Sequence, residues 1–352
     1  MKKALLIVAL MAGCMSASAQ KFDKNEMRQL QSFLQQPAEN AATNAQALGI
    51  SDIKNPATWT GVSFANGHVT TIDWKEKHLA GVLDLSGFEA LTTVNVSRNA
   101  LTGFNATNST ALARVDAQRN KIKDADFTGC TALQTLNIYK NRITDIEFAN
   151  TPALETVNIS NNLLASLDVA NSATLKTLNC QGNHLEQLKV EYCTNLKNLY
   201  CGYNKLTGIT LVGVEKLQNL NIDDNEISNL IISGLPSLST FICSDNNMQS
   251  LALRNCSVLL DLVCSYNNLT SLSVETCPQL LFVDCSYNDL TQLTLSNQTF
   301  LQRILCNNNQ LQMLDVSFDS ALTYINCRNN YITDLRTIGD NSLTMVACQW
   351  NY

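Results

Sequence analysis

Histidine is scarce in this chain of 352 residues, which contains only His68, His78 and His184. No serine, cysteine or carboxylate departs from the repeating pattern described below to form a catalytic pair with any of them. A C-x-x-C pair is also absent, which disfavours a zinc site despite the 13 cysteines. We therefore expect a protein that is not an enzyme and that needs no cofactor and no metal.

Long apolar runs and basic stretches are missing as well. The apolar stretch from Ala4 to Ala12 is shorter than the roughly 20 residues that a membrane-spanning helix needs, and no later stretch approaches that length. The formal net charge is −6, with no long run of either sign. This balance opposes binding to nucleic acid or to anionic lipid, so we expect neither as a partner.

The first 19 residues have the layout of a secretory signal peptide. Met1-Lys2-Lys3 precedes the apolar stretch, and Ala17-Ser18-Ala19 supplies small residues for cleavage. A second reading remains open, because Leu10 to Cys14 resembles the lipobox of bacterial lipoproteins, in which the cysteine is acylated. Both readings predict export to the cell surface, to the outer membrane or to the medium, with a lipid on Cys14 as the sole membrane attachment.

A period of 21 residues organises the rest of the chain without a single insertion. Asparagine recurs at Asn99, Asn120, Asn141, Asn162, Asn183, Asn204, Asn225, Asn246, Asn267, Asn288, Asn309, Asn330 and Asn351. A leucine stands eight places before each of these asparagines, from Leu91 to Leu343. A fixed period of this length is typical of a stacked coil, or solenoid.

Each repeat alternates apolar and polar residues in two places. Counted from the asparagine, apolar residues recur at −8, −5, −3, +2, +5 and +7, as in Leu259 to Val274. This pattern predicts a short strand on one wall of each coil and a second extended wall opposite. We expect the asparagine amide at the corner to bond to backbone groups left unpaired there, so that equal spacing stacks the amides into a ladder.

The cysteines follow the same register, which argues against a disulfide scaffold. Apart from Cys14 they lie three places before the asparagine, as Cys264 does, or ten places after it, as Cys256 does. Other repeats fill the first position with valine, alanine or isoleucine, so cysteine behaves as a small buried hydrophobe. Neighbouring coils stand about 4.8 Å apart, whereas a disulfide favours Cβ atoms about 3.8 Å apart. We expect reduced, buried stacks, with a few strained disulfides or a metal as alternatives.

Residues 20–90 precede the repeats and form an N-terminal lead. Asp23 with Glu26 predicts a capping box for a helix that Pro37 ends, and the polar stretch from 35 to 46 indicates a loosely held linker. Alternation from Trp59 to Trp74 around an Asn-Gly turn predicts a hairpin that covers the first coil. Residues 91–352 then form a solenoid of about 12.5 repeats of 21 residues. The last strand of the solenoid has no covering element in the predicted pattern, so self-association through this C-terminal edge is an alternative to a monomer.

This repeat resembles the 21-residue bacterial subclass of leucine-rich repeats, sometimes called IRREKO, over residues 91–352. The cysteine stack is also similar to that of the internalin group of bacterial surface adhesins. The resemblance implies a right-handed solenoid, mainly β with few helices, a parallel sheet on its concave face, and a role in adhesion. Trp59-x-Gly61-Val62 resembles the start of plant-type repeat caps but lacks their cysteines, and no wall-anchoring motif follows the repeats.

A ligand would bind the outward positions of the concave sheet, six, four and two places before each asparagine. The first half of this face is a lattice of threonine and asparagine that suits any exposed sheet. Farther along, apolar and charged residues gather, and tyrosines line the adjacent corner. The candidate ligand-binding residues are Tyr200, Tyr203, Ile242, Val263, Tyr266, Phe282, Asp284, Tyr287, Arg303, Leu305 and Tyr324. Scattered surface apolar residues or a self-association face are the alternatives.

Acidic residues cluster on the opposite wall at Asp124, Asp126, Asp145, Glu147 and Asp168. We interpret them as a solvated face whose charge is offset by Lys121, Lys123 and Arg142, with a calcium ion as the alternative. Taken together, the sequence predicts an exported bacterial binding or adhesion protein that recognises a protein partner. A carbohydrate-binding surface protein and a passive structural spacer are the alternatives.

Overall fold

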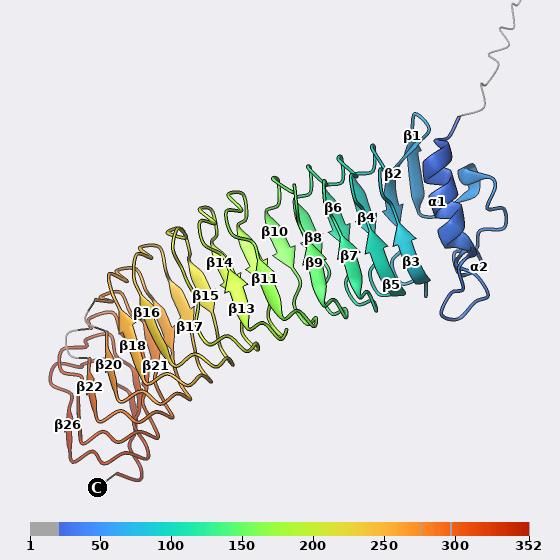
Figure 1. Ribbon diagram of the computed structural model, residues 1–352. Coiled ribbons are helices and arrows are strands. Elements are labelled where there is room, and N and C mark those ends of the chain that lie inside the picture. Colours follow the sequence, from blue (N-terminus) through green and yellow to red (C-terminus); the bar gives the residue numbers. More distant parts are fainter. Residues whose placement is uncertain (1–20, 275, 296–297, 352) are drawn as a thin grey trace, which may run out of the picture.

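The computed structural model describes residues 21–274, 276–295 and 298–351. The predicted signal peptide, with Cys14, lies outside these residues. The described chain forms a curved rod of stacked coils with helix α1 across its N-terminal end (Figure 1). The predicted class, a leucine-rich-repeat type of parallel β-solenoid with few helices and an N-terminal cap, is confirmed. No helix among the described residues is long and apolar enough to cross a membrane.

One parallel sheet, here called the main sheet, runs the length of the rod. Its 15 described strands are β1 (Val62–Ala65), β2 (His68–Asp73), β4 (Thr93–Asn95), β6 (Arg114–Asp116), β8 (Thr135–Asn137), β10 (Thr156–Asn158), β12 (Thr177–Asn179), β14 (Asn198–Tyr200), β15 (Asn219–Asn221), β17 (Thr240–Ile242), β19 (Asp261–Val263), β21 (Phe282–Asp284), β23 (Arg303–Leu305), β25 (Tyr324–Asn326) and β27 (Met345–Ala347). Only β1 is antiparallel to its neighbour.

The opposite wall, here called the second wall, carries four smaller parallel sheets in the described chain. The first consists of β3 (Ala80–Asp84), β5 (Ala100–Asn105), β7 (Asp124–Asp126) and β9 (Asp145–Glu147). The next two are the pairs β11 (Ser166–Asp168) with β13 (Gln187–Lys189), and β16 (Asn229–Ile232) with β18 (Ser250–Leu253). The last consists of β20 (Ser271–Ser273), β22 (Gln292–Thr294), β24 (Met313–Asp315) and β26 (Asp334–Arg336).

The period sets the strand register, because equivalent residues of successive coils pair directly. Leu199 pairs with Leu220, and Val157 pairs with Leu178, in each case 21 positions apart. These central strand residues are buried, while the residues on either side of them are mostly half-buried and face outward. The predicted inward and outward assignment is therefore confirmed for the strand itself.

We expected the residue two places before each asparagine to face outward. This prediction is wrong in several coils. Ser97, Ser160 and Ser244 at this position are buried. The chain turns here, and the residue that follows adopts a left-handed conformation with φ between 49° and 63° in every repeat. The small side chain consequently folds back on the strand, where the Ser160 hydroxyl donates to Asn158 Oδ1 over 2.6 Å.

The predicted asparagine ladder is present. Asn267 Oδ1 accepts a hydrogen bond from the Met248 amide of the preceding coil over 3.0 Å. Its Nδ2 donates to the carbonyls of Cys243 and Cys264 over 3.0 and 3.3 Å. Equivalent bonds recur along the rod and end at Asn351. Each amide thus ties its own coil to the coil before it.

The twelve described cysteines are free thiols, and eleven of them are buried. Burial raises the pKa of the Cys180 thiol to about 12 and of the Cys327 thiol to about 11. These two thiols therefore stay protonated and apolar at neutral pH, as expected of small core residues. Cys348, at the C-terminal end of the stack, is exposed.

Helix α1 (Lys24–Gln35) begins as predicted, but only half of the predicted capping box forms. Asp23 accepts from the Asn25 and Glu26 amides, which is half of the expected capping box. The Glu26 side chain does not return the bond. It is buried against the hairpin instead, where it accepts from the Val69 amide over 2.8 Å and contacts His68 Nδ1 at 3.0 Å.

The stretch from 35 to 46 is not a loose linker, because buried polar bonds hold it against the first coil. Asn44 at the start of α2 (Asn44–Ala47) is fully buried and donates to the carbonyls of Phe33 and Ala80. A short 3-10 turn, η1 (Pro56–Thr58), follows. The polar composition predicted a loosely held linker, but the Gln36 and Asn44 side chains both bond to backbone groups of β3.

The predicted hairpin is formed by β1 and β2, with Asn66 and Gly67 at positive φ in the turn. Strand β2 also pairs in parallel with β4, so one coil of the solenoid precedes Leu91. The indole of Trp74 is buried beneath this coil and stacks on Phe33 of α1, with ring centroids 5.6 Å apart. The hairpin and helix together cover the first coil.

Candidate binding surface

One row of the main sheet carries an ordered cation between two aromatic rings. Phe282, Arg303 and Tyr324 are successive partners in register on β21, β23 and β25. The Arg303 guanidinium carbon lies 5.4 Å from the Phe282 ring centroid and 5.6 Å from the Tyr324 ring centroid. Cation–π contacts at exposed sites contribute about 0.5–1 kcal/mol each, so this exposed arginine is oriented before any partner arrives.

A second row beside it is mostly apolar. Ile242, Val263, Asp284 and Leu305 are successive partners in register, and all four are half-buried. Asp284 Oδ1 accepts from the amide and the hydroxyl of Ser286, which fixes the carboxylate in place. The row offers apolar surface interrupted by a single oriented negative charge.

Two tyrosines stand at the corner of the same coils. The rings of Tyr266 and Tyr287 are stacked with centroids 4.2 Å apart and planes 8° apart, and both side chains are exposed. The neighbouring Tyr287 hydroxyl raises the pKa of Tyr266. Both residues have positive φ, a conformation that costs a bulky residue about 1–2 kcal/mol and that the repeat imposes on this position. Each ring covers one face of the other.

The structure therefore brings nine candidate residues together on β17 to β25 and the adjoining corner. They are Ile242, Val263, Tyr266, Phe282, Asp284, Tyr287, Arg303, Leu305 and Tyr324. The two remaining candidates lie elsewhere: Tyr200 pairs in register with asparagines of β12 and β15, and Tyr203 stands at the corner of that coil. We name the set of nine the aromatic patch.

Acidic residues that were not among the predicted site residues separate Tyr203 from the aromatic patch. Asp224 and Asp245 occupy the corner position in the two intervening coils. Burial, followed by the charge of Asp224, raises the pKa of Asp245. Burial also raises the pKa of Asp223, one position earlier. The repeat register was the signal that could have found this acidic border, since these positions align with Tyr203 and Tyr266.

In the polar half of the main sheet, side chains of neighbouring coils form hydrogen bonds with one another. Asn219 Nδ2 donates to Asn198 Oδ1 over 2.7 Å, and Asn198 Nδ2 donates to Thr177 Oγ1 over 3.1 Å. Side chains that already bond to the next coil have less hydrogen-bonding capacity for a ligand. This half therefore fits the structural interpretation of the threonine and asparagine lattice. No group of three or more histidine, cysteine or acidic residues among the described residues could hold a metal ion.

Comparisons with known proteins agree with this architecture. The sequence model of the leucine-rich repeats family (2 copies) matches residues 131–172. The functional domain of internalin J from Listeria monocytogenes, which includes a cysteine ladder, is 25% identical with a TM-score of 0.62; the match covers 78% of this chain and 66% of that one. The chain thus spans just under two thirds of that structure. No curated protein matches the sequence.

Two further solved structures share the fold. Internalin F from Listeria monocytogenes is 20% identical with a TM-score of 0.62, over 93% of this chain and 96% of that one. The leucine-rich effector protein YopM from Yersinia pestis is 20% identical with a TM-score of 0.58, over 79% and 88%. The leucine-rich repeats model thus matches part of the solenoid, and the fold of the described chain is similar to that of bacterial internalins. Such folds commonly mediate protein–protein recognition and are typically binding scaffolds rather than enzymes.

Proposed function

We propose that this chain is an exported bacterial binding or adhesion protein that recognises a protein partner through the concave main sheet. The partner would be a protein of a host or bacterial surface, and the contact would centre on the aromatic patch. Catalysis plays no part in this function. The signal-peptide layout of residues 1–19, or the alternative lipobox ending at Cys14, supports export, and the cell surface or the medium is the proposed location.

The observation that carries the proposal is the Arg303 sandwich within an apolar surface. Rings and a guanidinium that already hold one orientation lose little side-chain entropy when a partner binds. Aromatic and arginine residues are enriched among the side chains that dominate binding energy at protein interfaces, and here they stand beside half-buried aliphatic residues. A rigid solenoid then binds by many contacts with little rearrangement.

The test is affinity capture from host and bacterial extracts with the mature protein and two variants. Phe282→Asp puts a charge into the patch and removes one wall of the Arg303 sandwich. Thr156→Asp makes the same charge change at the equivalent exposed position of β10, in the polar half. We expect one partner to be retained by the wild type and by Thr156→Asp and lost with Phe282→Asp. Identical retention by all three proteins would contradict the proposal.

The stacked tyrosines distinguish the protein partner from a glycan. Sugar rings pack on aromatic faces, and in the Tyr266–Tyr287 pair one face of each ring is already covered. We expect the double variant Tyr266→Ala, Tyr287→Ala to bind a polysaccharide array to the same extent as the wild type. Array binding by the wild type that this double variant abolishes would favour the carbohydrate-binding alternative. Cell adhesion equal to wild type in both Phe282→Asp and the double tyrosine variant would favour the passive spacer.

A further inference from the structure

A corner edge runs along one side of the rod, where the chain passes from the main sheet to the second wall. We define the corner edge by the residues directly before and directly after each ladder asparagine. The residue before the asparagine has positive φ in every described repeat, so the backbone presents its side chain in the same way from coil to coil. Equivalent residues of successive coils stand about 4.8 Å apart. The corner edge is therefore a regular row in which only the side chains change.

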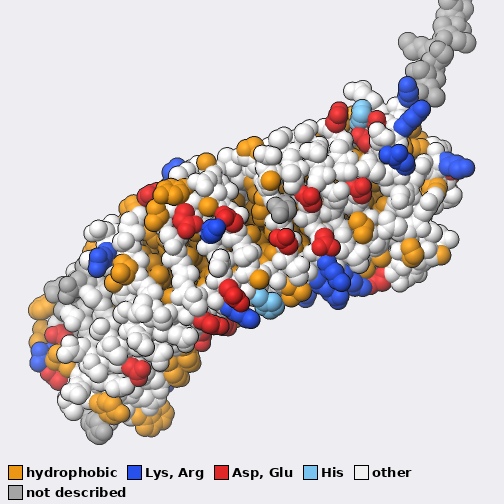
Figure 2. Space-filling view, in the orientation of Figure 1, with side chains coloured by type: hydrophobic (Ala, Val, Ile, Leu, Met, Phe, Trp, Pro, Cys, Tyr) orange, Lys and Arg blue, Asp and Glu red, His pale blue; other side chains and the backbone are white. Residues whose placement is uncertain are grey.

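The charge of the corner edge reverses along the rod. In the coils of Asn99, Asn120 and Asn141 its residues include no acidic side chain and five basic ones: Arg98, Arg119, Lys121, Lys140 and Arg142. From Asn225 to Asn288 they include no basic side chain and four acidic ones: Asp224, Glu226, Asp245 and Asp289. Figure 2 shows basic side chains gathered along the lower margin of the N-terminal half of the rod, with acidic side chains farther along the same margin.

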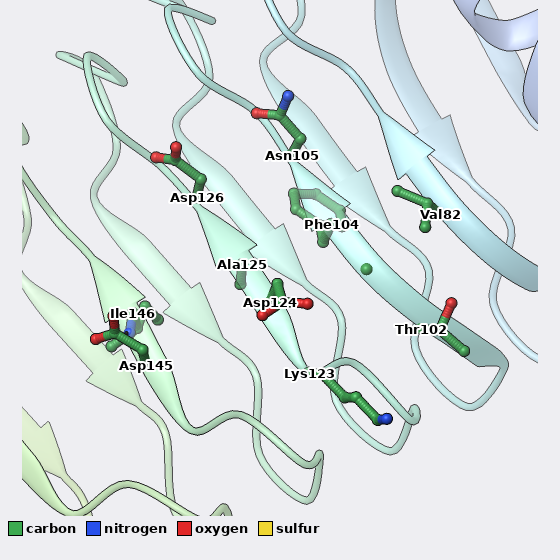
Figure 3. Close-up of a pocket in the computed structure, with 11 residues that line it drawn as sticks. Val82, Thr102, Phe104, Asn105, Lys123, Asp124, Ala125, Asp126, Asp145 and Ile146 are labelled. Atoms are coloured by element: carbon green, nitrogen blue, oxygen red, sulfur yellow. Dashed lines mark hydrogen bonds between the residues drawn. The ribbon is translucent and has the colours of Figure 1, made fainter.

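The basic residues near the acidic part of the second wall do not neutralise it, although we expected Lys121, Lys123 and Arg142 to do so. Lys121 pairs instead with Glu39 of the N-terminal lead, with Nζ 2.9 Å from Oε1. Lys123 and Arg142 form no ion pair with a described residue. Figure 3 shows the carboxylates of this wall on neighbouring strands: Asp124, Asp126 and Asp145. The basic surface of these coils therefore lies mainly along the corner edge.

Most charges of the corner edge are exposed and unpaired. Arg98 pairs with Glu76 over 3.0 Å, but several others form no ion pair within the described chain. These are Arg119, Lys140, Arg142, Asp224, Glu226 and Asp245. The Arg119 guanidinium carbon lies 5.7 Å from the Tyr139 ring centroid, which orients this side chain. Both halves of the corner edge thus offer charges to a partner of opposite sign.

The two halves are complementary to each other when a second copy of the rod lies antiparallel to the first. Lys140 stands two coils before Gly182, and Asp224 stands two coils after it. Arg119 and Asp245 stand three coils before and three coils after Gly182. A two-fold axis beside Gly182 therefore places each of these basic residues opposite the matching acidic residue of the second copy.

The residues that follow the asparagine fit the same axis. Arg142 and Glu226 stand two coils before and two coils after His184, which lies in the coil of Gly182. Lys205 is the one basic residue between the two charged halves, and this axis places it opposite Leu163, which has no charge. In this register no lysine or arginine meets another, and no acidic residue meets another. The arrangement is therefore attractive along its length.

The shape of the rod permits this contact. Gly182 has no side chain at the point where the two copies meet, whereas the coils on either side carry Asn161 and Tyr203 at this position. A two-fold axis directed from the main sheet to the second wall reverses the direction of the curved rod and keeps its curvature (Figure 1). The two corner edges consequently follow each other over several coils.

We propose that two copies of this chain associate along their corner edges, antiparallel, around a two-fold axis beside Gly182. Three contacts then occur twice: Lys140 with Asp224, Arg119 with Asp245, and Arg142 with Glu226. Because the contact is narrow and its charges are exposed, the dimer is a weak one that salt dissociates. It uses neither the outward rows of the main sheet nor the C-terminal edge, so it goes beyond the proposed function.

The test is sedimentation velocity of the mature protein at low and at high salt. Lys140→Glu and Asp224→Lys, made separately, each bring like charges together at both symmetric contacts. In an equimolar mixture of the two variants, the mixed dimer has opposite charges at both contacts again. The matched control is Lys197→Glu, which reverses an exposed charge outside the corner edge. Far-ultraviolet circular dichroism checks that every variant is folded.

We expect the wild type and Lys197→Glu to dimerise at low salt, with a Kd that rises about tenfold or more at high salt. Each corner-edge variant alone should dimerise about tenfold or more weakly, and the mixture should return to within about threefold of the wild type. Phe282→Asp should dimerise as the wild type does, which separates this inference from the proposed function. A wild type that stays monomeric at low salt, or a mixture no tighter than its components, would overturn the proposal. So would dimers that persist in both single variants, or equal weakening in Lys197→Glu.

Discussion

Replacement of a central ladder asparagine should destabilise the solenoid far more than replacement of the last one. In Asn267→Ala the Met248 amide of the preceding coil loses its acceptor, and Met248 is fully buried. Three donor contacts to the carbonyls of Cys243, Cys264 and Ser265 disappear as well. Asn267 itself is only 7% exposed, so this corner gives water little access to replace them.

The magnitude follows from the two kinds of loss. A buried donor without a partner costs about 1–3 kcal/mol, and each lost hydrogen bond to a carbonyl contributes about 0.5–1.5 kcal/mol net. We expect the free energy of unfolding to fall by about 3 kcal/mol or more. Asn351→Ala breaks equivalent bonds to Ile332, Cys327 and Cys348, but Asn351 is half-buried and Cys348 is exposed. Water can replace much of this loss, so we expect about 1 kcal/mol.

The assay is urea unfolding followed by far-ultraviolet circular dichroism, with wild type and both variants measured at one protein concentration. The change in free energy comes from the shift in midpoint multiplied by the common slope. If Asn351→Ala proves as destabilising as Asn267→Ala, or if Asn267→Ala unfolds with wild-type stability, the ladder does not contribute through buried amide bonds.

Two further predictions concern the thiols and the cap. Among the described cysteines of the folded protein, iodoacetamide should modify only Cys348. Burial keeps the reagent away from the other thiols, and it also raises pKa values such as those of Cys180 and Cys264. Peptide mass mapping that finds Cys264 modified would contradict this prediction. The bond to Glu26 raises the pKa of His68 above 6.5, so the stabilisation from this pair is complete below 6.5 and is lost as the pH rises through the folded-state value. The thermal midpoint should fall across that window in the wild type, and a fall of equal size in Glu26→Gln would show that the pair is not its cause.

Repetition explains why so much of the fold could be predicted. A strict 21-residue period with alternating apolar positions leaves a single register in which Leu262 faces inward and its neighbours face outward. The same period places every ladder asparagine above the last. Both features are local patterns multiplied by translation along the rod, so no long-range pairing had to be inferred.

Contacts that break the repetition could not be predicted in this way. Lys121 pairs with Glu39, 82 positions earlier, because the lead folds back along the rod. Glu26 could have completed a capping box, yet the nearby hairpin offered the Val69 amide and His68. In both cases the side chain contacts a partner distant in sequence and not a local one, because packing of the cap places the distant partner within reach.

For the candidate binding residues, too, part of the arrangement follows from the repeat and part only from the tertiary structure. Sequence register alone predicted which side chains of β17 to β25 face outward. Whether they act together depends on side-chain geometry between coils, such as the position of Arg303 between Phe282 and Tyr324. Register could equally have grouped Tyr203 with Tyr266, but two coils lie between them, and these coils carry Asp224 and Asp245 at the same corner position.

The amino-acid sequence by itself determined the coil, its register, its buried face and its amide ladder, because each follows from a short pattern repeated at constant spacing. The tertiary structure decided which charges meet. It paired Lys121 with Glu39 of the N-terminal lead and not with Asp124, which is nearer in sequence. It paired Asp168 with Lys189 of the next coil, because the partner that a lysine reaches depends on the path of the backbone and not on distance in sequence.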